Sequence, residues 1–203
     1  MINAQKFNQV GSKKYLKMKK IGLFLVLIIA STSIFAQQNT NSTKKGEVQW
    51  ITIQEAYTRT QKEPRKTIID VYTAWCGWCK VMDKQTYTNP EVIAYLNKNF
   101  YMVKLDAESK QDIIIGNTKY IFDEKSGANQ AALALLQGKM SYPTTVFLDA
   151  QYNMIQPLPG YMDAKAFHQI ITYLGGDYNK KEPFEQYKEG TYKEIYKAVL
   201  AKL

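Results

Sequence analysis

The sequence predicts an α/β domain in which helices cover both faces of a mixed central sheet. Stretches rich in β-branched and aromatic residues alternate along the chain with stretches of helical composition, and the last three elements of this pattern are strand, strand and helix. A chain of 203 residues with 45% hydrophobic and 22% charged residues has the composition of one ordinary folded domain. This composition argues against disordered, collagenous and multi-spanning membrane proteins.

The first predicted strand is residues 66–73, an apolar run that one carboxylate, Asp70, interrupts. The composition of residues 79–85 is compatible with a helix. Another helix is expected after Asn89, because asparagine caps helix N-termini well and Pro90 suits the first helical position. The apolar face of this helix comprises Val92, Ile93, Tyr95, Leu96 and Phe100.

The remaining elements follow in the same alternation. The longer segment 107–130 is predicted to contain a hairpin that turns at Gly116 and Asn117, and it either recognises partners or covers an edge strand. Residues 179–203 carry aromatic residues partly at helical spacing, which predicts a C-terminal helical extension that packs on the domain or forms an interaction surface. The other predicted elements are strands at 101–106, 144–148 and around 154–157, a helix at 131–136, and a helix capped by Asp163 that carries Phe167, Ile170, Ile171 and Leu174.

Residues 1–36 have the three parts of a secretory signal peptide. Six lysines and no acidic residue accompany an apolar run at 21–30, and small residues lead to Ala36, after which we expect cleavage. The alternative is a transmembrane anchor, but residues 21–36 fall short of the roughly 20 apolar residues that a membrane-spanning helix needs. We therefore predict secretion across the inner membrane, with residues 37–45 as a polar linker.

The net charge of +9 is concentrated at the N-terminus. Of the 27 basic residues, 6 lie in residues 1–36, which leaves 21 basic against 18 acidic residues in the rest of the chain. A basic protein raises the question of a nucleic-acid partner, but this distribution favours none.

The chain contains two cysteines, Cys76 and Cys79. A disulfide across so short a loop restricts the unfolded chain little, so chemistry at the sulfur atoms explains the pair better than stabilisation of the fold does. The main alternative is half of a zinc site, but zinc takes four ligands and the sequence adds only the distant His168. We therefore predict no metal site, and we assign no catalytic role to His168.

The cysteine pair lies between the predicted strand 66–73 and the predicted helix 79–85. Unpaired backbone N–H groups at a helix N-terminus favour a thiolate over a thiol, so Cys76 is the expected nucleophile. Cys79, one helical turn later, is placed to attack the resulting mixed disulfide and release the substrate.

Three features of the chain belong together: Asp70, the run Trp75-Cys76-Gly77-Trp78-Cys79-Lys80, and the later Tyr142-Pro143-Thr144. This combination resembles the thioredoxin superfamily. From Ile68 to about Leu174, the chain is more narrowly similar to periplasmic thioredoxin-like domains such as the C-terminal domain of the thiol:disulfide interchange proteins. The resemblance implies a thioredoxin fold over residues 46–178, with a hairpin-like insertion.

The resemblance also implies roles for individual residues. Asp70 would be a buried acid that exchanges a proton with Cys79 and is accompanied by Lys104, although an ordinary strand-end carboxylate would look the same in sequence. Pro143 would follow a cis peptide bond, in a loop that pairs with extended substrates. Trp78 departs from the Gly-Pro pair of typical thioredoxins, which leaves the direction of electron flow open. The expected substrate-binding residues are Trp75, Gly77, Trp78, Tyr142, Pro143 and Thr144.

Together these features predict a secreted, periplasmic thiol–disulfide oxidoreductase that reduces protein disulfides through a Cys76/Cys79 dithiol–disulfide cycle. The alternatives are a thiol oxidase or disulfide isomerase with the same pair, and a non-enzymatic peptide-binding module. Electrons would come from an upstream redox partner such as a membrane relay, because the sequence has no nicotinamide- or flavin-binding motif. We expect protein or peptide disulfides as substrates, and no cofactor or nucleic acid.

Overall fold

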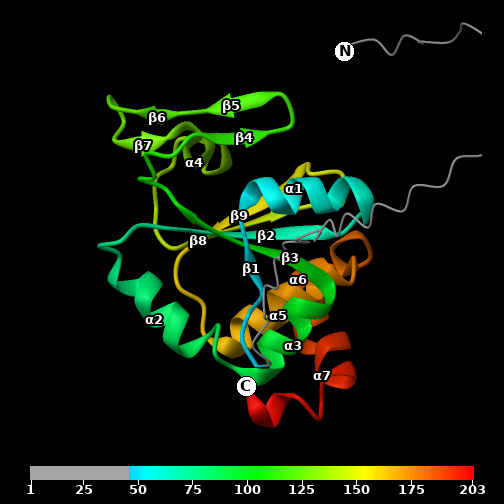
Figure 1. Ribbon diagram of the computed structural model, residues 1–203. Coiled ribbons are helices and arrows are strands. Elements are labelled where there is room, and N and C mark those ends of the chain that lie inside the picture. Colours follow the sequence, from blue (N-terminus) through cyan, green and yellow to red (C-terminus); the bar gives the residue numbers. More distant parts are fainter. Residues whose placement is uncertain (1–45) are drawn as a thin grey trace, which may run out of the picture. The chain divides into compact units, whose positions relative to one another are not determined.

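A computed structural model describes residues 46–203 of the protein. The predicted signal peptide (1–36) and linker (37–45) lie outside the described residues. Five strands form one sheet: β1 (Trp50–Ile51), β2 (Lys66–Tyr72), β3 (Phe100–Asp106), β8 (Thr144–Leu148) and β9 (Met154–Pro159). Their order across the sheet is β1-β3-β2-β8-β9 (Figure 1). The pairs β1–β3 and β2–β3 are parallel, whereas β2–β8 and β8–β9 are antiparallel, so the predicted mixed sheet is confirmed.

Helices cover both faces of this sheet, as predicted (Figure 1). Helices α1 (Ile53–Lys62) and α4 (Gln130–Leu135) lie over one face. Helices α2 (Gly77–Gln85), α3 (Pro90–Asn99) and α5 (Ala164–Gly175) lie over the other.

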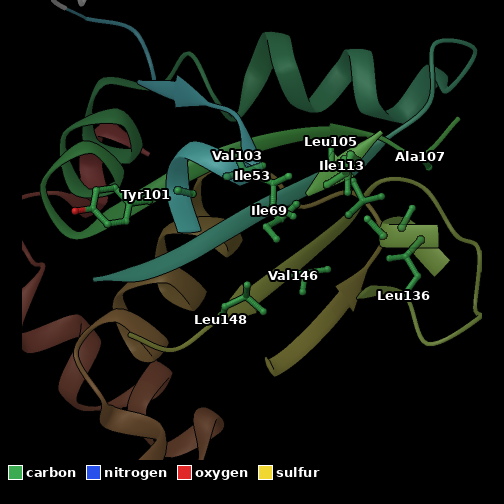
Figure 2. Packing of buried hydrophobic residues seen from close by; sticks show 14 residues of the cluster. Ile53, Ile69, Tyr101, Val103, Leu105, Ala107, Ile113, Leu136, Val146 and Leu148 are labelled. Atoms are coloured by element: carbon green, nitrogen blue, oxygen red, sulfur yellow. The ribbon is translucent and has the colours of Figure 1, made fainter. Parts of the chain in front are cut away.

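Alternation along the central strands assigns each side chain to one of two cores. On β2, Ile69 packs with Val103 and Val146 under α1 and α4, whereas its neighbour Ile68 packs under α3 and α5. Figure 2 shows the first core, in which the side chains of the strands meet those of Ile53 from α1. Because Asp70 is two residues from Ile68, it lies on the sheet face that α2 and α3 cover.

Two helices start where their capping residues predict. The side chain of Asn89 accepts hydrogen bonds from the N–H groups of Glu91 and Val92, directly before α3. The carboxylate of Asp163 accepts a 2.8 Å hydrogen bond from the Ala166 N–H at the start of α5. Such side chains satisfy donors that a helix N-terminus otherwise leaves unpaired.

The insertion forms two short hairpins. Strands β4 (Ile113–Ile115) and β5 (Thr118–Tyr120) pair around Gly116, which has a φ of +59° and so adopts the conformation that glycine favours in such a turn. A second pair, β6 (Phe122–Asp123) and β7 (Ala128–Asn129), leads into α4 and was not predicted. Ile113 is buried in the core beneath α1, so the insertion covers part of the domain.

The sequence did not predict β1 or α1. β1 has only two residues, and α1 is mostly polar, with Ile53 and Tyr57 as its only large apolar side chains. The cap of α1 is Thr52, whose hydroxyl accepts a hydrogen bond from the Glu55 N–H at 3.1 Å.

The C-terminal extension packs on α5. It contains η1 (Tyr178–Lys180), α6 (Phe184–Glu189), α7 (Thr191–Ile195) and η2 (Leu200–Lys202). Its fully buried Tyr187 donates a 2.8 Å hydrogen bond to the hydroxyl of Thr172. The hydroxyl of Tyr192, also fully buried, lies 2.9 Å from Nδ1 of His168, so this histidine joins the extension to α5.

Acid is expected to weaken this junction. Burial lowers the pKa of His168 from 6.5 to about 4, so the unfolded chain binds the proton more tightly than the folded protein does. The contribution of His168 to the free energy of unfolding is therefore complete above about pH 6.5 and falls by about 2 to 3 kcal/mol as the pH drops to 4.5. Urea unfolding at pH 7.5 and 4.5 measures this loss. In the His168→Gln variant, which cannot titrate here, the loss is expected to be smaller by that amount; equal losses in both proteins would contradict the assignment.

Candidate active site

The two cysteines form a disulfide at the start of α2. Cys76 is the residue that caps α2, and the backbone N–H of Cys79 donates to its Sγ at 3.1 Å. The helix begins directly after Cys76, two residues earlier than predicted. Both cysteines are at most 5% exposed, whereas Trp75 and Trp78 are 66% and 60% exposed.

This geometry favours a thiolate on Cys76 once the disulfide is reduced. The N–H of Cys79 would then donate to a negatively charged sulfur, and the N-terminal end of the α2 dipole lies at the same sulfur. One of the N–H groups at the start of α2 that have no helical carbonyl partner therefore donates to the sulfur that the sequence analysis predicts to be the nucleophile.

Asp70 lies on the sheet face beneath α2. Cys79 and Met82 are the buried residues of α2, and Met82 packs with Ile68, which shares a face of β2 with Asp70. The carboxyl group is 2% exposed, and its Oδ1 has no hydrogen-bond partner among the described residues. Burial raises the pKa of Asp70 to about 6, which Lys104 opposes.

Lys104 pairs with two carboxylates rather than one. It lies directly opposite Asp70 in the parallel register of β2 and β3, with its Nζ 3.5 Å from Asp70 Oδ2. The same Nζ contacts Asp83 of α2 more closely. It also lies 5.2 Å from the centroids of the Trp50 and Tyr72 rings, in a setting that stabilises a cation.

Asp83 is a residue that the sequence analysis missed. It is placed four residues after Cys79, one turn further along α2, and this spacing was the available signal. The ion pair with Asp83 partly neutralises Lys104, so Lys104 stabilises the ionised form of Asp70 less than it otherwise would. The negative charge of Asp83 also raises the pKa of Asp70 further.

The loop before β8 contains a cis peptide bond between Tyr142 and Pro143. The carbonyl of Pro143 accepts a 2.8 Å hydrogen bond from the Gly160 N–H, which joins the loop to the end of β9. Thr144 is buried and its hydroxyl donates to the carbonyl of Ser141 at 2.7 Å, so its side chain braces the loop rather than facing a substrate.

Aromatic side chains form two walls beside the disulfide. The Trp75 ring packs edge-on against Tyr142, with centroids 5.8 Å apart, and the Trp78 ring lies 5.3 Å from that of Tyr161. A hollow of about 280 Å³ is lined by Trp78, Tyr142, Pro143, Gly160 and Tyr161. The structure thus brings together Trp75, Trp78, Tyr142 and Pro143, four of the residues that the sequence analysis expects to bind substrate.

Two residues that line or brace this surface carry no signal in the sequence. Tyr161 comes from the segment between β9 and α5, and its hydroxyl donates a 3.0 Å hydrogen bond to Gln85 of α2. Glu108 comes from the insertion, and its carboxylate accepts a 2.8 Å hydrogen bond from the Trp75 indole N–H. At Gly77, by contrast, a Cβ atom would meet nothing within 4 Å, so the fold does not require glycine there.

Within residues 46–203, no helix is long and apolar enough to cross a membrane. In the same range, no three His, Cys, Asp or Glu side chains converge as metal ligands.

Parts of this chain are similar in sequence to known proteins. Spermatogenesis-associated protein 20 of Mus musculus is 33% identical over 60 residues, which cover 30% of this chain and 8% of that protein. Thiol:disulfide interchange protein DsbD of Vibrio vulnificus strain CMCP6 is 26% identical over 168 residues, which cover 76% of this chain and 26% of that protein. The chain therefore matches only a minor part of each relative's length.

Solved structures resemble it at low sequence identity. A DsbH oxidoreductase is 19% identical with a TM-score of 0.48, and the match covers 68% of this chain and 94% of that one. A thioredoxin-fold protein from Helicobacter pylori is 16% identical with a TM-score of 0.49, and the match covers 72% of this chain and 99% of that one.

A family model covers most of the chain. The model Thioredox_DsbH, whose description is a protein of unknown function, DUF255, matches residues 27–194. These residues include all of the main sheet, the cysteine pair and the cis-proline loop. The chain accordingly belongs to the Thioredox_DsbH family, within the thioredoxin superfamily.

Proposed function

We propose that the protein reduces protein disulfides through a dithiol–disulfide cycle of Cys76 and Cys79. The observation that carries this proposal is the position of Cys76 as the cap of α2, where the Cys79 N–H reaches its sulfur. Membership of a family of thioredoxin-like disulfide oxidoreductases supports it.

Reduction takes place in two exchange steps. The Cys76 thiolate attacks one sulfur of the substrate disulfide, forms a mixed disulfide and releases the other substrate sulfur as a thiolate. The Cys79 sulfur, as a thiolate, then attacks Cys76 Sγ, which breaks the mixed disulfide and releases the second substrate thiolate. Two electrons pass from the protein to the substrate, and the Cys76–Cys79 disulfide is left.

Asp70 is proposed to accept the proton of Cys79 in the second step. Its ionised form is available at neutral pH, since its pKa is raised only to about 6, and that raised pKa makes it a better proton acceptor than an exposed carboxylate. Lys104 is proposed to hold this carboxylate in place through the 3.5 Å ion pair.

A second dithiol protein must reduce the disulfide again, because the cycle consumes two electrons for each turnover. We propose an upstream redox partner such as a membrane electron relay, and a periplasmic location. Residues 1–36 would direct export and 37–45 would act as a linker. Residues 46–178 would catalyse the exchange, and 179–203 would brace α5.

The two cysteines are expected to respond differently to substitution. Cys76→Ser removes the attacking sulfur and should abolish turnover of an insulin disulfide, whereas Cys79→Ser leaves attack intact and should accumulate mixed disulfides. Turbidity measures turnover, and non-reducing electrophoresis detects the trapped species. The control is Ile195→Ala, an exposed residue of α7, which should behave as wild type. Turnover by the Cys76→Ser variant would refute the mechanism.

Asp70→Asn is expected to slow the protein and stabilise it at the same time. Loss of the proton acceptor should reduce the rate of mixed-disulfide resolution on the order of a hundredfold and remove the inflection near pH 6 from the rate profile. A folded-state pKa above the unfolded value means that the ionised group lowers the free energy of unfolding at pH 7, so the asparagine variant should unfold at higher urea concentration. A stabilised variant with a wild-type rate profile would exclude the proton-transfer role.

A further inference from the structure

We propose that the protein selects extended polypeptides that carry a large apolar side chain and a basic side chain close to the reacting cysteine. The groove lined by Trp78, Tyr161 and the cis-proline loop would take the apolar side chain. Asp106 and Glu108 would attract the basic one. This inference rests on the proposed disulfide reduction and names the substrate class for it.

The groove is suited to one large apolar side chain. Its volume of about 280 Å³ is open beside Trp78, whose indole is 60% exposed although it packs on Tyr161. Tyr142, Pro143 and Gly160 form the rest of the lining, so none of the described residues that line the groove is charged. Binding of an apolar side chain to these exposed rings is favourable because it removes apolar surface from water. An aromatic substrate residue would add ring contacts.

Hydrogen bonds hold the groove open in advance. The hydroxyl of Tyr161 donates to Gln85 of α2 at 3.0 Å, which fixes its ring relative to the helix that carries Trp78. The N–H of Gly160 donates to the Pro143 carbonyl at 2.8 Å, which fixes the opposite side relative to the cis-proline loop. Because the groove is already formed, binding of a substrate loses little entropy in ordering its walls.

The part of the surface next to Trp75 and Tyr142 is acidic. The Glu108 carboxylate accepts from the Trp75 indole N–H, and the Asp106 carboxylate accepts from the backbone N–H of Glu108 at 3.0 Å. Neither donor carries a charge, so both negative charges remain available to a cation. Both carboxylates lie close enough to Tyr142 to raise its pKa further, after the larger effect of its burial.

Both walls include a tryptophan next to the cysteine pair. Trp75 directly precedes Cys76 and packs on Tyr142, while Trp78 follows two residues later and packs on Tyr161. Tyr142 also lines the groove, so the acidic wall and the apolar groove adjoin each other beside Cys76. An extended chain reaches both with residues close to its cysteine, because it advances about 3.3 Å per residue.

Peptides with one cysteine, linked to free cysteine as a mixed disulfide, test the proposal. The residues that flank the cysteine are Phe and Lys, Gly and Lys, or Phe and Glu. Each pair is made in two peptides, with the order of the two flanking residues exchanged. The reduced protein reacts with each under single-turnover conditions, and acid quench with mass spectrometry gives the rate constants. In one of the two orders, the wild type is expected to prefer Phe to Gly by about three- to tenfold, and to prefer Lys to Glu by a ratio that shrinks with added salt.

Variants test the contribution of each wall separately. Trp78→Ala and Tyr161→Ala should each bring the Phe/Gly ratio toward one and leave the Lys/Glu ratio in place, whereas Glu108→Gln should lower only the Lys/Glu ratio. Ratios are taken within each variant, so a partly unfolded sample does not change them. Ile195→Ala, equally exposed but on α7, should retain both wild-type ratios.

Two different negative results separate failure of this substrate class from failure of the proposed function. If the wild type reacts with all peptides at equal rates, or if the wall variants keep both ratios, the substrate class is wrong and disulfide reduction stands. If the wild type reacts with no peptide while alkylation shows both of its cysteines reduced, the proposed function fails, and the inference falls with it.

Discussion

The structure depends on β2 being buried on both faces and hydrogen-bonded on both edges. Its residues pair in full register with β3 on one side and with β8 on the other, so the strand cannot shift without moving apolar side chains to the wrong core. That register places Asp70 opposite Lys104 and directs the chain into Cys76 at the start of α2. The site is therefore an outcome of how the central strand is held.

The site contains features that oppose stability. Asp70 is buried, and within residues 46–203 one of its oxygens has no hydrogen-bond partner. It also shares Lys104 with Asp83. Two tryptophans beside the cysteines are mostly exposed to water. A protein selected only for stability would bury the rings and remove the acid. The proposed function accounts for both features, because it needs a carboxyl group that changes protonation and a surface that meets a substrate.

The sequence predicted the secondary-structure elements that hydrophobic periodicity, capping residues and turn residues mark. The strand at 66–73, the helix after Asn89 and the hairpin around Gly116 all form close to their expected places. It did not predict α1, which is mostly polar, or contacts between side chains that only the tertiary structure brings together. Tyr161 reaches Trp78 from the segment after β9, and Glu108 reaches Trp75 from the insertion. Long-range contacts of this kind leave no trace in local spacing. The Thr144 hydroxyl turns inward for a local reason, because the conformation of the loop brings the carbonyl of Ser141, three residues earlier, within reach.

The most direct test of the central claim is the reduction potential of the Cys76–Cys79 pair. Residues 46–203 or the full chain, equilibrated in glutathione or dithiothreitol buffers and alkylated, report the reduced fraction as a mass shift. A protein that reduces disulfides is expected to have a value near the roughly −270 mV of thioredoxin. A value near about −120 mV, that of a strong oxidant, would contradict the account, because the pair would then donate its disulfide rather than its electrons.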